Sequence, residues 1–263
     1  MKIRDIAATI EAFAPLSLQE SYDNSGLIVG RPDDEVHAAL LAVDVTEEVI
    51  QEAVREGCDI IITHHPIIFH PLKRFNSSNY VERCVELAIR KGIALYACHT
   101  NLDSAAEGMS WQLGQMIGLE RMEVLQPRKD NPTTGFGVVG TLPRAEGVMA
   151  LMSRVKSIFD VGAVRYSDLP TEDMMVRRVA ICTGAGASLI DDALRAEADM
   201  YITADLKYND FMRGDGRMVL ADIGHFESEF CAIRILFDII SKNLCTFAVR
   251  KSVCSRNPIH YLL

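Results

Sequence analysis

A weak internal repeat constrains the fold of this 263-residue chain more than any other feature of its sequence. Residues 41–65 align without a gap with residues 181–205, at a separation of 140 positions. Six of the 25 aligned pairs are identical and most of the others keep their polarity, so that "CDIIITHH" aligns with "ADMYITAD". Because the repeated segment has the pattern of a strand, a helix and a strand, it predicts a duplicated α/β unit.

Apolar runs alternate with amphipathic segments on both sides of the repeat. We expect strands at 37–45, 59–65, 93–100, 136–142, 177–184, 199–205 and 217–224. We expect helices at 1–16, 46–57, 79–92, 105–118, 147–159, 188–198 and 225–243. Strands that alternate with helices predict an α/β fold, in which mixed and mostly parallel sheets are covered by helices.

The stretch "LQPRKDNPTTG" at 125–135 separates the two halves of this pattern. Its prolines, its glycine and its polar residues are typical of a linker. We therefore place the first α/β unit at residues 1–127 and the second at residues 128–263.

Composition and charge argue against several classes of protein. The net charge of −9 disfavours binding to the phosphate backbone of nucleic acid. No apolar run has the length that a membrane span needs, and the first residues lack the apolar centre of a secretory signal. Seven cysteines without a C-x-x-C pair indicate reduced thiols rather than a disulfide framework. We therefore expect a cytoplasmic protein that contacts neither membranes nor nucleic acid.

Histidines and carboxylates gather where three of the expected strands end. They are His64 and His65 in "THHP", His99 and Asp103 in "HTNLD", and His225 and Glu229 in "GHFESE". In open α/β sheets, functional sites form at the carboxyl ends of the strands. Imidazoles and carboxylates from three strand ends match a site for one or two first-row metal ions. Because adjacent strand residues point to opposite faces, the tandem histidines can each serve one metal of a pair.

The two copies of the repeat differ in this chemistry. At the positions of His64 and His65 the second copy carries Ala204 and Asp205, so the first copy is the better candidate for a metal site. His99 is either a further ligand or a residue that orients a ligand or moves a proton. We favour the second role.

The stretch "CTGAGASL" places Gly184 and Gly186 between a strand and a helix. Backbone N–H groups in such a turn can bind a phosphate at the start of the helix. Glycines there are equally typical of a tight turn without a ligand.

Two further pairs are candidates for contacts with a substrate. Lys73 and Arg74 follow the tandem histidines and face either an anionic substrate or solvent. Asp23 and Asn24 either line the pocket or form a local turn.

The stretches "SYDNSGLIVG", "THHPIIF", "HTNLD" and "GHFESE", in this order, resemble the signatures of the GTP cyclohydrolase type 2 family, also called the NIF-three-like family. The resemblance spans the whole chain. It implies two intertwined, duplicated α/β units, a dinuclear metal centre at their interface and a ring-shaped homohexamer. The metal ligands that it implies are His64, His65, Asp103, His225 and Glu229. The chain resembles the short form of the family, which has no extra mid-chain domain.

These observations favour a metal-dependent hydrolase. Two divalent ions (Zn, Fe(II) or Mn(II)) would activate water for attack on an electrophilic carbon or phosphorus of a small-molecule substrate. The resemblance implies GTP or a related nucleotide as that substrate. Two alternatives stay open: a metal-stabilised, ring-shaped scaffold or regulatory protein without catalysis, and a nucleotide-binding switch or transferase built on the glycine turn at Gly184.

Overall fold

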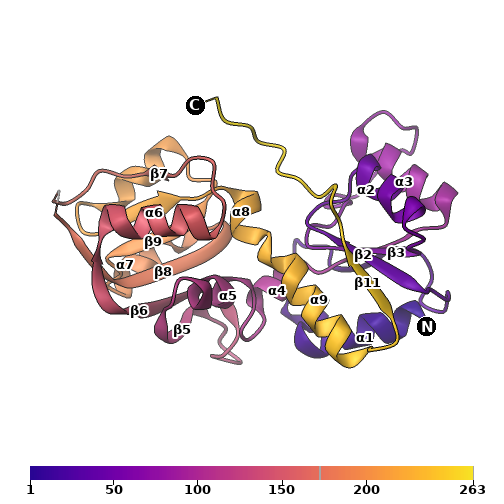
Figure 1. Ribbon diagram of the computed structural model, residues 1–263, viewed down its shortest axis with the longest axis horizontal. Helices are drawn as coiled ribbons and strands as arrows, with labels where there is room; N and C mark the ends of the chain where they lie inside the picture. The colour runs from indigo at the N-terminus through magenta and orange to yellow at the C-terminus, as the bar shows by residue number, and fades with distance from the viewer. Residues whose placement is uncertain (172, 263) are drawn as a thin grey trace. The chain divides into compact units, whose positions relative to one another are not determined.

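The computed structural model of the chain describes residues 1–171 and 173–262 (Figure 1). The chain forms two compact units, of which unit 1 contains Met1–Ala105 and Ala232–Arg256. Unit 2 contains residues 106–231 and 257–262. The predicted boundary between residues 127 and 128 falls inside unit 2. Because each unit takes two separate stretches of the chain, the units are intertwined.

The sheet of unit 1 is mostly parallel. In the part of the chain that the structure describes, its strands are β1 (Gly26–Val29), β2 (Ala38–Ala42), β3 (Ile60–Thr63), β4 (Ala94–Ala97) and β11 (Ala248–Lys251). They lie in the order β1-β4-β3-β2-β11, in which β1 runs antiparallel to β4 and the other neighbours are parallel. The carboxyl ends of β2, β3 and β4 therefore meet at one edge of the sheet.

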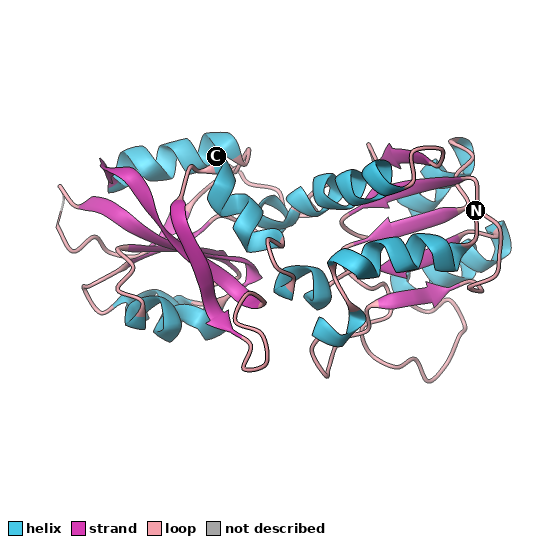
Figure 2. Ribbon diagram, turned by 90° about the horizontal axis from the view of Figure 1, so that it is seen from below, coloured by secondary structure: helices cyan, strands magenta, loops and turns pink. Residues whose placement is uncertain are grey.

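Helices cover both faces of this sheet (Figure 2). They are α1 (Ile3–Phe13), α2 (Glu47–Arg55), α3 (Tyr80–Lys91), α4 (Thr100–Ser104), α9 (Cys231–Asn243) and the short 3-10 helix η1 (Leu16–Leu18). α2 and α3 pack on the face that contains Leu40 and Ile61. The opposite face contains Ile62 and Tyr96, and the Tyr96 hydroxyl donates a hydrogen bond to Glu11 of α1 (3.0 Å).

The sheet of unit 2 is mixed. Over residues 106–171 and 173–231 its strands are β5 (Glu120–Pro127), β6 (Gly135–Gly147), β7 (Arg165–Tyr166), β8 (Met175–Ala185), β9 (Met200–Ala204) and β10 (Val219–Asp222). They lie in the order β5-β6-β8-β9-β10-β7, in which β8, β9 and β10 are parallel and the other neighbours are antiparallel. This sheet is less parallel than the sequence pattern predicts, because β5 and β6 form a long hairpin.

The hairpin also corrects the predicted linker. Residues 125–135 contain the end of β5 and the turn into β6, with Pro127 opposite Gly135. The stretch therefore turns the chain within unit 2, and the prediction that it links the units is wrong. Prolines, glycines and polar residues are typical of hairpin turns as well as linkers, which explains the error.

Helices cover both faces of this second sheet as well. They are α5 (Met109–Met116), α6 (Val148–Ile158), α7 (Ile190–Arg195) and α8 (His225–Glu229), with the 3-10 helices η2 (Ala187–Leu189) and η3 (Tyr208–Gly214). α5 and α6 pack on the face that contains Val138 and Ile181, whereas α7 and η3 pack on the face that contains Val139 and Ala180. Among the described residues, no helix is both long enough and apolar enough to cross a membrane.

The strand register confirms the internal repeat. In unit 1, β2 pairs in parallel with β3 through Ala39 and Ile60. In unit 2, β8 pairs in parallel with β9 through Val179 and Met200, each 140 positions later. The two copies therefore share their pairing register as well as their order of elements.

An aspartate just before the second strand of the repeat binds the backbone of the first strand in both copies. The Asp59 carboxylate accepts hydrogen bonds from the N–H groups of residues 37 and 38 (2.6 and 3.3 Å). The Asp199 carboxylate accepts hydrogen bonds from the N–H groups of residues 177 and 178, both at 2.8 Å. This backbone role explains why the aspartate is identical in the two copies.

Candidate metal centre

The tandem histidines stand directly after β3. His64 is completely buried, and its Nδ1 lies 2.9 Å from the carbonyl oxygen of Cys98. His65 is partly exposed, and its Nδ1 lies 2.7 Å from Oδ1 of Asp44. Because each of these oxygens accepts the hydrogen bond, Nδ1 carries the proton in both rings. Nε2 then bears the lone pair that binds a metal.

His99 is oriented in the same way, by Asp23. Nδ1 of His99 lies 2.7 Å from Oδ1 of Asp23, whose side chain is completely buried. The other Asp23 oxygen accepts hydrogen bonds from the Ser25 hydroxyl (2.9 Å), the Thr100 N–H (3.0 Å) and the Thr100 hydroxyl. Burial raises the pKa of Asp23, but the hydrogen bonds from His99 and Thr100 outweigh it and hold the pKa below its usual range. Asp23, for which the sequence left open a place in the substrate pocket or in a local turn, is a buried carboxylate that orients His99.

The three imidazoles of unit 1 form one cluster. The ring centroids of His64 and His65 are 4.9 Å apart, and the centroid of His99 lies 5.2 and 5.4 Å from theirs. One nitrogen of each ring lies within 4.8 Å of the others, so all three are within reach of a single cation. Asp103, in α4, has Oδ1 at 3.8 Å from Nε2 of His64. The geometry thus fits His99 as a ligand too, which is the alternative that the sequence analysis did not favour.

Unit 2 has its own pair of ligand-type side chains, on α8. His225 and Glu229 are one helical turn apart, with Nε2 of His225 at 2.9 Å from Oε2 of Glu229. Nδ1 of His225 lies 2.7 Å from Oδ2 of Asp205. Burial lowers the pKa of His225, but Glu229 and Asp205 outweigh it and raise the pKa to about 9. The metal-free imidazole is therefore a cation between two carboxylates, and a metal at Nε2 would replace its proton.

Gly184 allows the Glu229 carboxylate to approach the backbone. Gly184 has a φ of +61°, and a Cβ atom there would lie 2.2 Å from Oε1 of Glu229 and 3.5 Å from Cε1 of His225. The Gly184 N–H donates a hydrogen bond to the Ser228 hydroxyl (2.9 Å). The space beside Gly184 is thus filled by side chains of α8.

Gly186 is confined in a similar way. A Cβ atom at Gly186 would lie 2.2 Å from Oγ1 of Thr203 and 2.4 Å from the Tyr201 hydroxyl. That hydroxyl donates a hydrogen bond to the Gly186 carbonyl (2.8 Å). These contacts favour the tight-turn interpretation of "CTGAGASL" over a phosphate cradle.

The other candidate substrate contacts lie in or beside the loop between β3 and α3. Lys73 and Arg74 are exposed in this loop. Asn24 is half-buried, and its Nδ2 donates a hydrogen bond to the carbonyl oxygen of Ile68 (2.7 Å). Asn24 therefore anchors the loop, whereas Lys73 and Arg74 are open to solvent.

Two orienting carboxylates, Asp44 and Asp205, were not predicted from the sequence. Asp44 follows β2 and binds Nδ1 of His65, and Asp205 follows β9 and binds Nδ1 of His225. Both stand at strand ends, and Asp205 aligns with His65 in the repeat. The rule that identified the histidines could therefore have identified these carboxylates.

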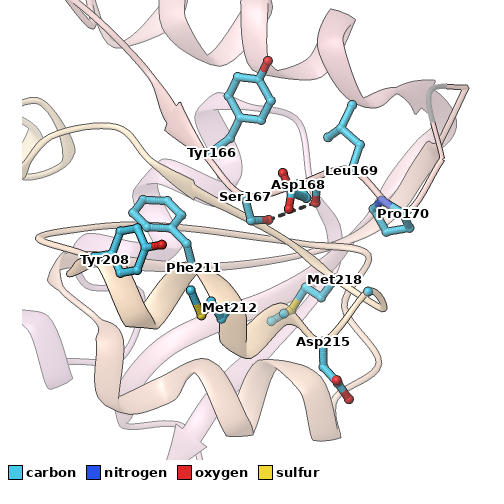
Figure 3. A pocket seen from close by; sticks show the side chains of 12 residues that line it. Tyr166, Ser167, Asp168, Leu169, Pro170, Tyr208, Phe211, Met212, Asp215 and Met218 are labelled. Carbon is cyan, nitrogen blue, oxygen red and sulfur yellow. Dashed lines mark hydrogen bonds between the residues drawn. The ribbon is translucent and has the colours of Figure 1, made fainter.

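A cavity of about 410 Å³ lies elsewhere in unit 2 (Figure 3). Its walls include Tyr166, Tyr208 and Phe211, and Met218 lines it just before β10 begins. His225 follows the other end of β10, so the cavity and the ligands of α8 lie at opposite edges of this sheet. Among the described residues that line it there is no lysine or arginine, so the cavity does not suit a phosphate.

The fold and its strand-end ligands define a class of protein: a duplicated α/β chain with imidazoles and carboxylates at the carboxyl ends of its strands. The family described as Duf34/NIF3 (NGG1p interacting factor 3) matches residues 1–258. The chain belongs to this family, which confirms the resemblance found in its motifs.

Relatives in this family align over most of the chain. A Lactococcus lactis protein named "GTP cyclohydrolase 1 type 2 homolog" is 36% identical over 265 residues, which cover 99% of each chain. A Clostridium perfringens protein of the same name is 34% identical over 232 residues, which cover 88% of this chain and 87% of that one. NIF3-like protein 1 of Drosophila melanogaster is 30% identical over 244 residues, which cover 88% and 81% of the two chains.

Solved structures share the fold. Staphylococcus aureus protein SA1388 has a TM-score of 0.91 at 24% identity and covers 100% of this chain and 99% of its own. A Bacillus cereus protein related to NIF3 has a TM-score of 0.91 at 22% identity, with the same coverage. Reduced HcgD from Methanocaldococcus jannaschii has a TM-score of 0.79 at 26% identity and covers 95% and 97% of the two chains.

Proposed function

We propose that the protein is a dinuclear metal-dependent hydrolase. In this proposal unit 1 supplies His64, His65 and Asp103, unit 2 supplies His225 and Glu229, and together they hold two divalent cations. Zn, Fe(II) and Mn(II) all accept a mixture of imidazole and carboxylate ligands. The donor set thus fits the dinuclear metal centre that the family resemblance implies, without selecting one of these metals.

The shared orientation of the imidazoles is the observation that supports this proposal most directly. His64, His65, His99 and His225 each turn Nδ1 toward an oxygen acceptor at 2.7–2.9 Å. Histidines that bind metals use the other ring nitrogen in this way, because the hydrogen bond fixes the tautomer and the direction of Nε2. The three imidazoles of unit 1 thus have the tautomer that metal ligation needs, and His225 would reach the same state when a metal replaces the proton on its Nε2.

The side chains of this site have separate tasks in the proposed reaction. Two bound cations would lower the pKa of water to near neutrality and polarise the electrophilic atom of the substrate. Asp44 and Asp205 hold His65 and His225 in position. If His99 does not bind metal, its Nε2 takes up a proton, and the buried Asp23 carboxylate stabilises the resulting imidazolium.

We propose GTP or a related nucleotide as the substrate. The support is the name "GTP cyclohydrolase 1 type 2 homolog" that relatives at 34% and 36% identity carry. Lys73 and Arg74 are exposed in the loop that follows the tandem histidines, where they would face the phosphates of such a substrate.

A second candidate function is a metal-stabilised ring, a homohexamer that acts as a scaffold or regulatory protein without catalysis. Exposed apolar side chains favour it, since Tyr208 is 79% exposed and Met212 is 62% exposed. Large apolar side chains of this kind are common where copies of a chain meet.

Metal content, turnover and assembly, measured separately, distinguish these functions. The protein is purified with Zn, Fe(II) or Mn(II), and its metal content, its turnover of GTP and its mass in solution are recorded. We expect two metal ions per chain and turnover in the wild type, with both reduced in His65→Ala and Asp103→Ala while the assembly persists. A metal-loaded wild type that turns over neither nucleotides nor phosphoesters, and variants that dissociate, would support the scaffold instead.

A further inference from the structure

Two aromatic side chains of unit 1 are exposed beside the imidazole cluster. Tyr22 is 62% exposed and Phe69 is 37% exposed. Their ring centroids are 6.3 Å apart, with 59° between the ring planes. The Phe69 centroid lies 5.9 Å from that of His99, and the two planes are nearly perpendicular (79°). Apolar surface is thus open to water next to the candidate ligands.

Hydrogen bonds hold the backbone on either side of these two rings. Tyr22 precedes Asp23, whose buried carboxylate binds His99 and Thr100. Phe69 follows Ile68, whose carbonyl oxygen accepts the hydrogen bond from Nδ2 of Asn24. The segment around Tyr22 is therefore tied both to the segment around Phe69 and to His99. The backbone that carries the two exposed rings is therefore held by hydrogen bonds without any ligand.

We propose that Tyr22 and Phe69 bind a planar heteroaromatic ring of the substrate, an inference that rests on the proposed metal-dependent activity. The two rings are tilted and do not stack on each other, and Phe69 also contacts the ring of His70 (centroids 4.9 Å apart, 71° between the planes). Both rings still keep part of their surface open to a ligand. A planar ring on Phe69 lies next to His99, at the edge of the imidazole cluster. Aromatic rings gain more from such a partner than aliphatic groups of similar size do.

The hydroxyl group of Tyr22 favours a heterocyclic ligand over a hydrocarbon ligand. A phenol hydroxyl donates or accepts a hydrogen bond while its ring makes apolar contacts. A ring nitrogen or a ring carbonyl oxygen would satisfy it. A sugar phosphate without a base would leave both aromatic rings exposed, so these residues select against it.

Binding of guanosine, adenosine and ribose 5-phosphate to Zn-loaded protein tests this proposal by calorimetry. The variants are Tyr22→Leu and Phe69→Leu, which keep an apolar side chain but remove the ring. Phe69→Tyr retains an aromatic ring and controls for folding. Tyr261→Leu, at a tyrosine of unit 2 that is 40% exposed, is the matched control. Metal content is measured for every variant.

We expect the wild type to bind at least one nucleoside more tightly than ribose 5-phosphate. The Tyr22→Leu and Phe69→Leu variants should each lose about tenfold or more of the nucleoside affinity, whereas Phe69→Tyr, Tyr261→Leu and all metal contents stay near the wild type. Equal nucleoside binding by wild type and leucine variants, or no nucleoside preference in the wild type, overturns the inference. A wild type that binds no metal instead overturns the proposed function, and the ring preference is then scored on the metal-free protein.

Discussion

Unit 1 and unit 2 share a scaffold and differ in the chemistry at its edge. The repeated strand, helix and strand keep their register 140 positions apart, and Asp59 and Asp199 bind equivalent backbone N–H groups. The next strand-end residues differ, because His64 and His65 of unit 1 correspond to alanine and aspartate in unit 2. The aspartates that bind the backbone are retained in both copies, whereas the side chains at the carboxyl end of the second repeated strand have diverged.

The two units nevertheless use one device to orient a histidine. In unit 1 the imidazole of His65 follows β3, and the carboxylate of Asp44 follows β2. In unit 2 the carboxylate of Asp205 stands at the position of His65, and the imidazole of His225 follows β10. A carboxylate thus stands in unit 2 at the repeat position where unit 1 has an imidazole, while the 2.7 Å contact between carboxylate and imidazole is the same.

Removing one imidazole from either unit should have the largest effect. We expect His65→Ala and His225→Ala each to lower metal affinity by about 100-fold or more, since each removes a proposed metal ligand. Turnover should fall with metal content. Metal analysis after dialysis against a weak chelator provides the measurement.

His37→Ala is the matched control, because this histidine belongs to unit 1 but its side chain is 81% exposed and pairs with Asp59. Its metal content should equal that of the wild type. If His225→Ala retained all of its metal while His65→Ala lost it, unit 1 would form the metal centre without unit 2.

Gly184→Ala should have the next largest effect, and it is specific to unit 2. The added methyl group would meet Oε1 of Glu229 at 2.2 Å, whereas unit 1 has Asp44 at the corresponding repeat position. We expect about 10- to 100-fold weaker metal binding, because Glu229 must move, and a loss of about 1–3 kcal/mol of stability from the positive φ and the clash. Calorimetric metal titration and denaturant unfolding measure the two effects.

Gly118→Ala is the control that separates the effect of the positive φ from the effect of the clash with Glu229. Gly118 also has a positive φ (+78°), but a Cβ atom there would meet nothing within 4 Å. We expect it to lower the stability by about 1 kcal/mol and to leave metal affinity unchanged. Equal metal affinity in the Gly184 and Gly118 variants would show that Gly184 does not position Glu229.

The orienting carboxylates allow the two units to be tested side by side. We expect Asp44→Ala and Asp205→Ala each to weaken metal binding by about tenfold, because the imidazole loses the hydrogen bond that fixes its tautomer and direction. Similar losses would support equivalent roles for the two carboxylates. If only one of the two variants lost metal affinity, the two contacts would share their geometry but not their role in metal binding.

Much of the fold and of the candidate ligand set could be predicted from the sequence, because both depend on local patterns. The order of apolar and polar residues predicts both the alternation of strands and helices and the repeat at an offset of 140 positions. The strand register confirms the repeat. The spacing of His225 and Glu229 predicted their contact on one face of α8. The motif "THHP" likewise located His64 and His65 at a strand end.

The features that the sequence did not reveal depend on tertiary contacts between distant residues. Asp23 resembles a turn residue until its hydrogen bond to His99, 76 positions away, is known. Gly184 resembles a phosphate-binding glycine until the position of Glu229 is known. The return of the C-terminal segment to unit 1 as β11 has no local signal either, since partner choice in a sheet is decided by the whole fold.

The smallest expected effect concerns one acidic repeat position, Glu52 in unit 1 and Asp192 in unit 2, and the hydrogen bonds that it makes to neighbouring segments. Glu52 of α2 is 4% exposed and accepts hydrogen bonds from the N–H groups of Val253 (2.9 Å) and Cys254 (3.1 Å) and from the Ser252 hydroxyl. At the same repeat position in unit 2, Asp192 binds the side chains of Gln126 and Arg195 (3.2 and 2.6 Å). Glu52 thus anchors a backbone segment, whereas Asp192 makes side-chain contacts only in the part of the chain that the structure describes.

We therefore expect Glu52→Gln to lower the free energy of unfolding at pH 7 by about 1 kcal/mol, and Asp192→Asn by about 0.5 kcal/mol or less. Burial raises the pKa of Glu52, but the hydrogen bonds from Ser252, Val253 and Cys254 outweigh it and lower the pKa below 4.5. A carboxylate whose folded pKa is depressed stabilises the fold above its unfolded pKa and ceases to do so as the pH falls through the folded value. The difference between wild type and Glu52→Gln should therefore persist at neutral pH and shrink in acid below about pH 4.5. Urea unfolding of both proteins across this range measures it, and a difference that grew in acid would mean that the ionised carboxylate does not secure the C-terminal segment.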